Sequence, residues 1–153
     1  MILKNKTILI TGCSSGIGYT TAKFLKKSGY RVIASARKDF DVKRLTDEGF
    51  ETLQLDLANS QSMQQAVKNL IQLTDGKIDA LFNNGAYGQP GAVEDLSREV
   101  LKEQFESNFF GTHELTNLIL PMMRQQGYGR IIYNSSVLGF VAMKYRGAYN
   151  ASK

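Results

Sequence analysis

The sequence of 153 residues is 42% hydrophobic and 22% charged, which is typical of a folded globular protein and not of a disordered one. No apolar run approaches the ~20 residues that a membrane-spanning helix needs, so a membrane span is excluded. The opening segment, residues 1–6, becomes charged within four residues and is therefore unlike a secretory signal peptide. The single cysteine, Cys13, excludes a disulfide framework, and Cys13 with His113 is too small a ligand set for a structural zinc site. We therefore expect a cytoplasmic protein without a bound metal.

The net charge of +5 is unevenly distributed along the chain. Residues 1–44 contain ten basic and two acidic residues, residues 45–120 contain four basic and twelve acidic residues, and residues 121–153 contain five basic residues and no acid. The basic first third favours a phosphate-bearing partner, either a nucleotide or a nucleic acid. The lysines at 23, 26 and 27 are interpreted instead as the solvated face of a helix.

Short apolar runs alternate with longer amphipathic segments. The runs predict five strands, over residues 7–11, 31–34, 52–55, 78–82 and 130–133. The segments between them predict helices over about 16–28, 40–48, 60–74 and 97–125. Ser60 and Ser97 are the expected N-caps of the last two helices, Gly29, Gly49, Gly76 and Gly127 are expected to end the four, and Pro121 should kink or loosen the last. This alternation predicts an α/β fold with one right-handed, doubly wound parallel sheet, which binds its ligand beyond the carboxyl ends of the strands.

A glycine-rich loop follows the first predicted strand and opens the first predicted helix, reading Thr-Gly-Cys-Ser-Ser-Gly-Ile-Gly from Thr11. Glycines permit a tight turn and let backbone N–H groups approach a pyrophosphate at the positive end of the helix. The residues expected to contact a dinucleotide here are Gly12, Ser14, Ser15, Gly16, Ile17 and Gly18. A tight turn that binds nothing is the alternative interpretation.

The second predicted strand leads into Arg37 and Lys38, without the acidic residue that would bind the ribose 2′-hydroxyl of NAD. A planar guanidinium suits a 2′-phosphate, so the expected cofactor is NADP(H), with Lys38 adding charge. The alternative is that Arg37 is a solvated loop residue. Asp56, at the end of the third strand, could accept a hydrogen bond from the adenine amino group or cap its own loop.

Five motifs in order resemble the short-chain dehydrogenase/reductase superfamily over the whole chain. They are TGxxxGIG at 11–18, Asn83-Asn84-Gly85, Asn108, Ser135-Ser136, and YxxxK from Tyr149 to Lys153. The resemblance implies a Rossmann-type sheet and adds Asn83 and Gly85 to the residues beside the cofactor. The glycine loop together with Arg37 is similar to the NADP-dependent hydroxysteroid and retinol dehydrogenase branch and to bacterial aldehyde reductases.

Tyr149 and Lys153 are spaced i and i+4, so on a helix they share one face. A neighbouring ammonium favours the phenolate form of a tyrosine, and the pair can therefore supply or accept the proton that accompanies hydride transfer at a carbonyl carbon. The resemblance implies that Lys153 also binds the nicotinamide ribose, that Ser136 rather than Ser135 steadies the substrate oxygen, and that Asn108 disturbs its helix and holds a water in a relay to Lys153. From the residues alone, Asn108 could equally be a core asparagine bonded to its own helix.

Two features depart from the family pattern. The chain reads Asn-Asn-Gly-Ala from Asn83 where the family usually has Asn-Asn-Ala-Gly, which predicts a slightly different backbone path. The chain also stops at Lys153, whereas family members continue with two more strands and a substrate-covering segment. We therefore expect residues 1–153 to be an incomplete dinucleotide-binding domain, truncated before the last two strands, whose activity alone is doubtful. The resemblance implies a homo-oligomer for the full-length protein.

Two loops, 87–93 and 137–147, are expected to border the substrate, and the apolar residues of the second favour an apolar carbonyl or alcohol. The leading hypothesis is an NADP(H)-dependent oxidoreductase with Tyr-Lys-Ser proton transfer, and the alternative is a non-catalytic NADP(H) sensor. Nucleic-acid binding is disfavoured because the chain lacks aromatic platforms and a recognition helix. Cys13 is interpreted as a small residue tolerated in the loop, with oxidation sensitivity as the alternative, and His113 as structural or solvated.

Overall fold

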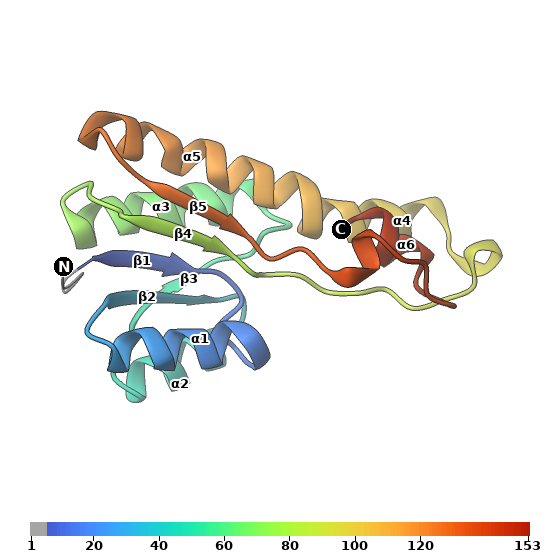
Figure 1. The fold of residues 1–153 in the computed structure, drawn as a ribbon, viewed down its shortest axis with the longest axis horizontal. Coiled ribbons are helices and arrows are strands. Elements are labelled where there is room, and N and C mark those ends of the chain that lie inside the picture. The colour runs from blue at the N-terminus through green and yellow to red at the C-terminus, as the bar shows by residue number, and fades with distance from the viewer. Residues whose placement is uncertain (1–5) are drawn as a thin grey trace.

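The computed structural model describes residues 6–153, and the residues used above to argue against a signal peptide lie mostly outside this range. Five strands of the described part form one parallel sheet in the order β3-β2-β1-β4-β5 (Figure 1). They are β1 (Thr7–Ile10), β2 (Arg31–Ala36), β3 (Glu51–Gln54), β4 (Ala80–Asn83) and β5 (Arg130–Tyr133). The predicted doubly wound α/β fold is confirmed, and each strand boundary lies within two residues of its expected place.

Helices cover both faces of the sheet (Figure 1). On one face, α1 (Gly16–Lys27) and α2 (Asp39–Asp47) pack through Ala22 and Leu45 against Ile10 and its neighbours. On the other, α3 (Ser60–Thr74) and α5 (Gly111–Gln126) pack on a larger core around Leu9 and Leu81. The central strands β1 and β2 are buried almost throughout, as expected for parallel strands that are covered on both faces.

The helix-ending signals behave largely as predicted. All four expected glycines have positive φ, between +72° and +88°. Ser97 caps α4 (Arg98–Phe105) by accepting a hydrogen bond from Val100 N. The prediction for Ser60 is wrong: Asn59 caps α3, and its Oδ1 accepts from Ser62 N at 2.9 Å. Asparagine caps a helix as well as serine does, so two adjacent candidates cannot be separated by residue type alone.

The long helix predicted near the end of the chain is interrupted by a π-helical turn, Glu106–Phe110, between α4 and α5. Asn108 is buried in the middle of this turn, so the expected disturbance of the helix is present. Immediately after it, Gly111 packs so closely on the loop after β3 that a Cβ there would lie 1.7 Å from Leu57 O. Pro121 lies inside α5 without ending it, and the carbonyl of Asn117 therefore lacks its helical donor.

The remaining elements gather beyond the carboxyl ends of the strands. They are α4, the short α6 (Gly147–Ala151), and two 3₁₀ turns, Val93–Asp95 and Val137–Gly139 (Figure 1). At the sheet edge, β5 is mostly exposed, with Ile132 and Tyr133 about half accessible. Over residues 6–153, no helix combines the length and the apolar character needed to cross a membrane.

Replacing Gly111 with alanine tests the close packing of α5 on the loop after β3. We expect Gly111→Ala to lower the free energy of unfolding by about 3 kcal/mol or more, because the new methyl overlaps backbone that cannot rotate away. Gly76→Ala is the control: its φ of +72° costs about 1–2 kcal/mol, but its methyl enters open space. Urea unfolding measures both, and equal losses in the two variants would contradict the packing argument.

Candidate functional site

The glycine loop between β1 and α1 is shaped by contacts that only glycine permits. Gly12 has φ +69°, and a Cβ on it would lie 2.9 Å from the Cα of Gly85 in the loop after β4. A Cβ on Gly18 would lie 2.3 Å from Gly12 O. Gly16, in contrast, faces open space, because a methyl group on its Cα would have no neighbouring atom within 4 Å. The loop is therefore tightly packed on its inner side and open on its outer side.

The first turn of α1 offers backbone donors at this open side. Within the described residues, the Ser15 side chain makes no capping hydrogen bond to the helix that it precedes. The N–H groups of Gly16, Ile17 and Gly18 belong to the first helical turn, which has no carbonyl partners of its own. Donors at the positive end of a helix, beside a glycine that leaves room, fit a phosphate group.

A cleft of about 170 Å³ extends from the glycine loop across the ends of β2 and β3. Its lining includes Gly12, Ser14, Arg37, Asp56 and Gly85. The structure therefore brings together most of the residues predicted to contact the adenosine end of a dinucleotide. Asp56 lines the cleft, and its Oδ1 also caps its own loop by accepting from Ala58 N at 3.0 Å.

Arg37 and Lys38 differ in their surroundings. Arg37 is exposed, and the Gln54 side chain fixes its backbone by donating to Arg37 O at 3.3 Å. Lys38 lies at the N-cap of α2, where its ammonium sits 6.0 Å from the centre of the Phe40 ring. Arg37 lines the cleft and Lys38 does not, so Arg37 is better placed than Lys38 to contact a group bound in the cleft.

The two asparagines at the end of β4 point in different directions. Asn84 turns towards the glycine loop, where its Nδ2 donates to Thr11 O at 3.0 Å. Asn83 is buried on the other side, where its Nδ2 donates to Thr116 Oγ1 at 3.1 Å and its Oδ1 has no partner in the described structure. Sequence reasoning named Asn83 as a cofactor residue, yet Asn84 makes the contacts with the loop.

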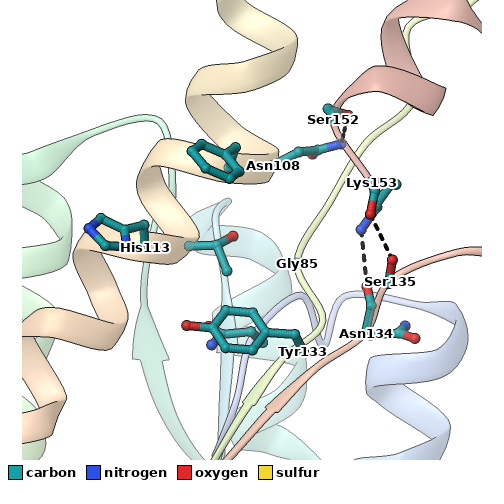
Figure 2. Close-up of a pocket in the computed structure, with 11 residues that line it drawn as sticks. Gly85, Asn108, His113, Tyr133, Asn134, Ser135, Ser152 and Lys153 are labelled. Atoms are coloured by element: carbon teal, nitrogen blue, oxygen red, sulfur yellow. Dashed lines mark hydrogen bonds between the residues drawn. The ribbon is translucent and has the colours of Figure 1, made fainter. Parts of the chain in front are cut away.

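Tyr149 lies in α6, whereas Lys153 lies two residues beyond the end of this helix, near the carboxyl end of β5, so the two do not share a helix face as the spacing predicted. The ammonium of Lys153 is 5.7 Å from the centre of the Tyr149 ring. It donates to Asn134 O at 3.1 Å (Figure 2). Ser135 Oγ donates to Lys153 O at 2.8 Å, which holds the backbone of the lysine against the loop after β5. Partial burial lowers the pKa of Lys153 below its usual value.

The two loops that were expected to border the substrate meet at Tyr149. Tyr87 and Gly88 from the loop after β4, and Leu138, Met143 and Arg146 from the segment before α6, line one open cleft with it. Arg146 was not singled out in the sequence, and its guanidinium donates weakly to Gly88 O at 3.4 Å. The lining is mainly apolar, with Arg146 as its cation.

Ser136 stands at the start of the 3₁₀ turn Val137–Gly139 and is half-buried. Its Oγ accepts a hydrogen bond from Leu138 N at 3.1 Å. Because a hydroxyl can accept and donate at the same time, this bond orients the oxygen and leaves its proton available to another acceptor.

Asn108 is hydrogen-bonded away from its own helix. Its Oδ1 accepts from Tyr87 N at 3.1 Å, and its Nδ2 donates to Tyr87 O at 2.8 Å. The same Nδ2 also donates to Ser152 Oγ at 3.1 Å (Figure 2). The interpretation of a core asparagine bonded to its own helix is therefore wrong. Ser152 immediately precedes Lys153, so Asn108 is hydrogen-bonded to the neighbour of the lysine in the chain. Gln104, one turn earlier and equally buried, was missed because its spacing resembles that of any polar helix residue.

Cys13 and His113 make local contacts. Cys13 is fully buried, its thiol donates to Ile10 O, and burial raises its pKa to about 12. This surrounding agrees with a small tolerated residue and not with an oxidation-sensitive one. His113 is exposed on α5 and shares a hydrogen bond of 2.9 Å with Asn117, one turn along.

Labelling of the single thiol tests the burial of Cys13. At pH 8 the folded protein should react with iodoacetamide at least about 100-fold more slowly than glutathione does, because a thiol with a pKa of about 12 is almost entirely protonated and is also shielded from reagent. The protein unfolded in urea should react at the glutathione rate, which controls for the reagent. Rapid labelling of folded protein would contradict the buried position of the thiol.

Comparison with known proteins supports the fold and its family. A family profile described as short chain dehydrogenase matches residues 6–153. The "Uncharacterized oxidoreductase YbbO" of Escherichia coli is 45% identical over 148 residues, which are 97% of this chain and 55% of that protein. A short-chain dehydrogenase structure from Streptomyces avermitilis superposes with a TM-score of 0.90 at 31% identity, covering 100% of this chain and 57% of that one.

A second similar structure is an actinorhodin polyketide ketoreductase solved with NADPH, with a TM-score of 0.88 at 29% identity, covering 97% of this chain and 59% of that one. The chain thus spans a little more than half the length of the relatives that it matches. The five-stranded parallel sheet, the glycine loop and the profile match over nearly the whole chain lead to one conclusion: the protein belongs to the short-chain dehydrogenase family.

Proposed function

We propose that residues 1–153 form the cofactor-binding part of an oxidoreductase that transfers a hydride between NADP(H) and a carbonyl or alcohol of an apolar small molecule. The observation that carries this proposal is that two groups of residues lie near each other beyond the carboxyl ends of the strands. The glycine loop and Arg37 lie around one cleft, and Tyr149 with Lys153 lies beyond the neighbouring strand ends. Family membership supports a nicotinamide cofactor, and one similar structure was solved with NADPH.

The residues present fit such a cofactor. The first-turn N–H groups of α1 would hold the pyrophosphate, and the open space beside Gly16 leaves room for it. Arg37 would pair with a 2′-phosphate through its planar guanidinium, and Asp56 would face the adenine. Bound there, the nicotinamide supplies or accepts the hydride.

Proton transfer is assigned to the side chains after β5. The hydroxyl of Tyr149 donates a proton to the carbonyl oxygen during reduction, and the nearby ammonium of Lys153 favours the phenolate that remains. Lys153 gives up its own proton more readily because burial lowers its pKa. Ser136 can donate to the same substrate oxygen while it accepts from Leu138 N.

The substrate is proposed to lie in the cleft between Tyr87, Leu138, Met143 and Tyr149. This lining favours an apolar body around the reacting carbon.

The first test is cofactor choice. We expect the protein to bind NADPH at least about tenfold more tightly than NADH, and Arg37→Met to weaken NADPH about tenfold with NADH changed less than twofold, since one charge-assisted hydrogen bond is worth ~1.5–3 kcal/mol. Lys43→Met, on the exposed side of α2 beside Asp47, is the control for loss of a positive charge. Calorimetric titration measures all three proteins. Equal losses of NADPH and NADH affinity in Arg37→Met would contradict the assignment.

The second test separates an enzyme from a sensor. In the active, longer protein we expect Tyr149→Phe to lower kcat for NADPH-dependent carbonyl reduction by about 10²–10⁴-fold, while the Kd for NADPH stays within about twofold. Tyr128→Phe, an exposed tyrosine between α5 and β5 at the opposite end of the sheet, should leave both quantities unchanged. Tight NADPH binding without any turnover of ketones or aldehydes would favour the non-catalytic sensor instead.

A further inference from the structure

Gln104 on α4 is fully buried, and its amide is engaged on both the oxygen and the nitrogen side. Its Oε1 accepts from Gln89 N at 2.7 Å, and its Nε2 donates to Tyr87 O at 2.9 Å and to Ser152 Oγ at 3.2 Å. A buried amide that makes its hydrogen bonds fixes the position of every partner, because each partner would lose its bond on moving into an apolar surrounding. Within the described residues, the side chain of Gln104 makes its hydrogen bonds to Gln89, Tyr87 and Ser152 and not to Tyr149 or Lys153.

The first connection from Gln104 leads to the ring of Tyr149. The two backbone groups that Gln104 binds, Tyr87 O and Gln89 N, lie on either side of Gly88. Gly88 packs closely on the ring of Tyr149, because a Cβ added to Gly88 would be only 3.0 Å from Cδ2 of the ring. The amide of Gln104 therefore fixes the backbone of residues 87–89, against which the ring of Tyr149 packs.

The second connection leads to the backbone of Tyr149. Ser152 is buried, and its Oγ donates to Tyr149 O at 3.0 Å. Ser152 Oγ also accepts hydrogen bonds from the side-chain amides of Gln104 and Asn108. Asn108 shares Tyr87 and Ser152 with Gln104, but Gln104 alone of the two reaches Gln89, beyond Gly88. Gln104 thus constrains Tyr149 from the ring side and from the main-chain side together.

We propose that Gln104 is a positioning residue that holds the phenol of Tyr149 in place through Gly88 and Ser152. The consequence for the reaction rests on the proposed role of Tyr149 as proton donor. A displacement of a reacting group by about 1 Å can cost as much as 10²-fold in rate, so a well-packed support for the phenol has a direct effect on turnover. A leucine at position 104 would leave Gln89 N without its acceptor, and a glutamate would lose both donors.

Nuclear magnetic resonance of the protein without cofactor tests the placement directly. Gln104→Met keeps the volume and removes every hydrogen bond, and Gln65→Met on the exposed face of α3 is the matched control. We expect the amide of Gln89 to exchange at least about tenfold faster in Gln104→Met, because its acceptor is gone. We also expect the ¹³Cζ resonance of Tyr149, assigned among the seven tyrosines with Tyr149→Phe, to move towards the free-tyrosine position, with both signals unchanged in Gln65→Met.

A Tyr149 resonance that stays at its original position in folded Gln104→Met overturns the proposal, whatever happens at Gln89. If Gln104→Met does not fold, Ser152→Ala decides in its place: it removes the bond to Tyr149 O and should move the same resonance in the same direction, and an unmoved signal overturns the proposal. In the active, longer protein, Gln104→Met should lower kcat about tenfold with the KM for NADPH unchanged. Absence of any turnover in the unsubstituted protein would count against the proposed function alone, because the resonance measurements need no cofactor or substrate.

Discussion

The hydrogen bonds between Thr11 and Asn84 hold the candidate site together. Thr11 Oγ1 accepts from Asn84 N at 2.9 Å and from Gly85 N at 2.7 Å, and Asn84 Nδ2 returns a bond to Thr11 O at 3.0 Å. These bonds bring the loops after β1 and β4 so close that Gly12 and Gly85 leave no room for a side chain between them. Because β1 and β4 are parallel neighbours, their carboxyl ends lie side by side, and the loops that follow them come into direct contact.

From Asn84 the polar contacts continue towards Tyr149 and Lys153. Asn84 Oδ1 accepts from Asn134 Nδ2 at 2.9 Å, and Asn134 O accepts from Lys153 Nζ at 3.1 Å. The glycine loop and Lys153 are therefore joined by a short series of hydrogen bonds across the carboxyl ends of β1, β4 and β5. Such a network positions its members jointly, so the glycine loop and Lys153 depend on the same strand ends for their placement.

Much of the fold could be predicted because its signals are local. Three signals each depend on residues within one turn or one strand: the apolar runs, the glycines with positive φ after the helices, and the cap at Ser97. Choices between neighbouring residues were harder to predict, and the predicted cap at Ser60 was wrong. Asn59 competes with Ser60 for the same cap, and Asn83 and Asn84 project to opposite sides of the chain at the end of β4. Which of two adjacent asparagines faces a loop is decided by the packing of β4, which residue type alone does not reveal.

The sequence by itself determined the family, the parallel α/β sheet and the glycine-rich loop that joins β1 to α1, since these follow from patterns along neighbouring residues. Only the tertiary structure decided that Asn84 supports the glycine loop, that Cys13 is a buried core thiol, and that Gln104 reaches Ser152. Each of these results depends on contacts between segments far apart in the chain, 73 positions for Thr11 and Asn84 and 48 for Gln104 and Ser152. Burial and partners at such separations arise from how the elements pack, and no local pattern carries that information.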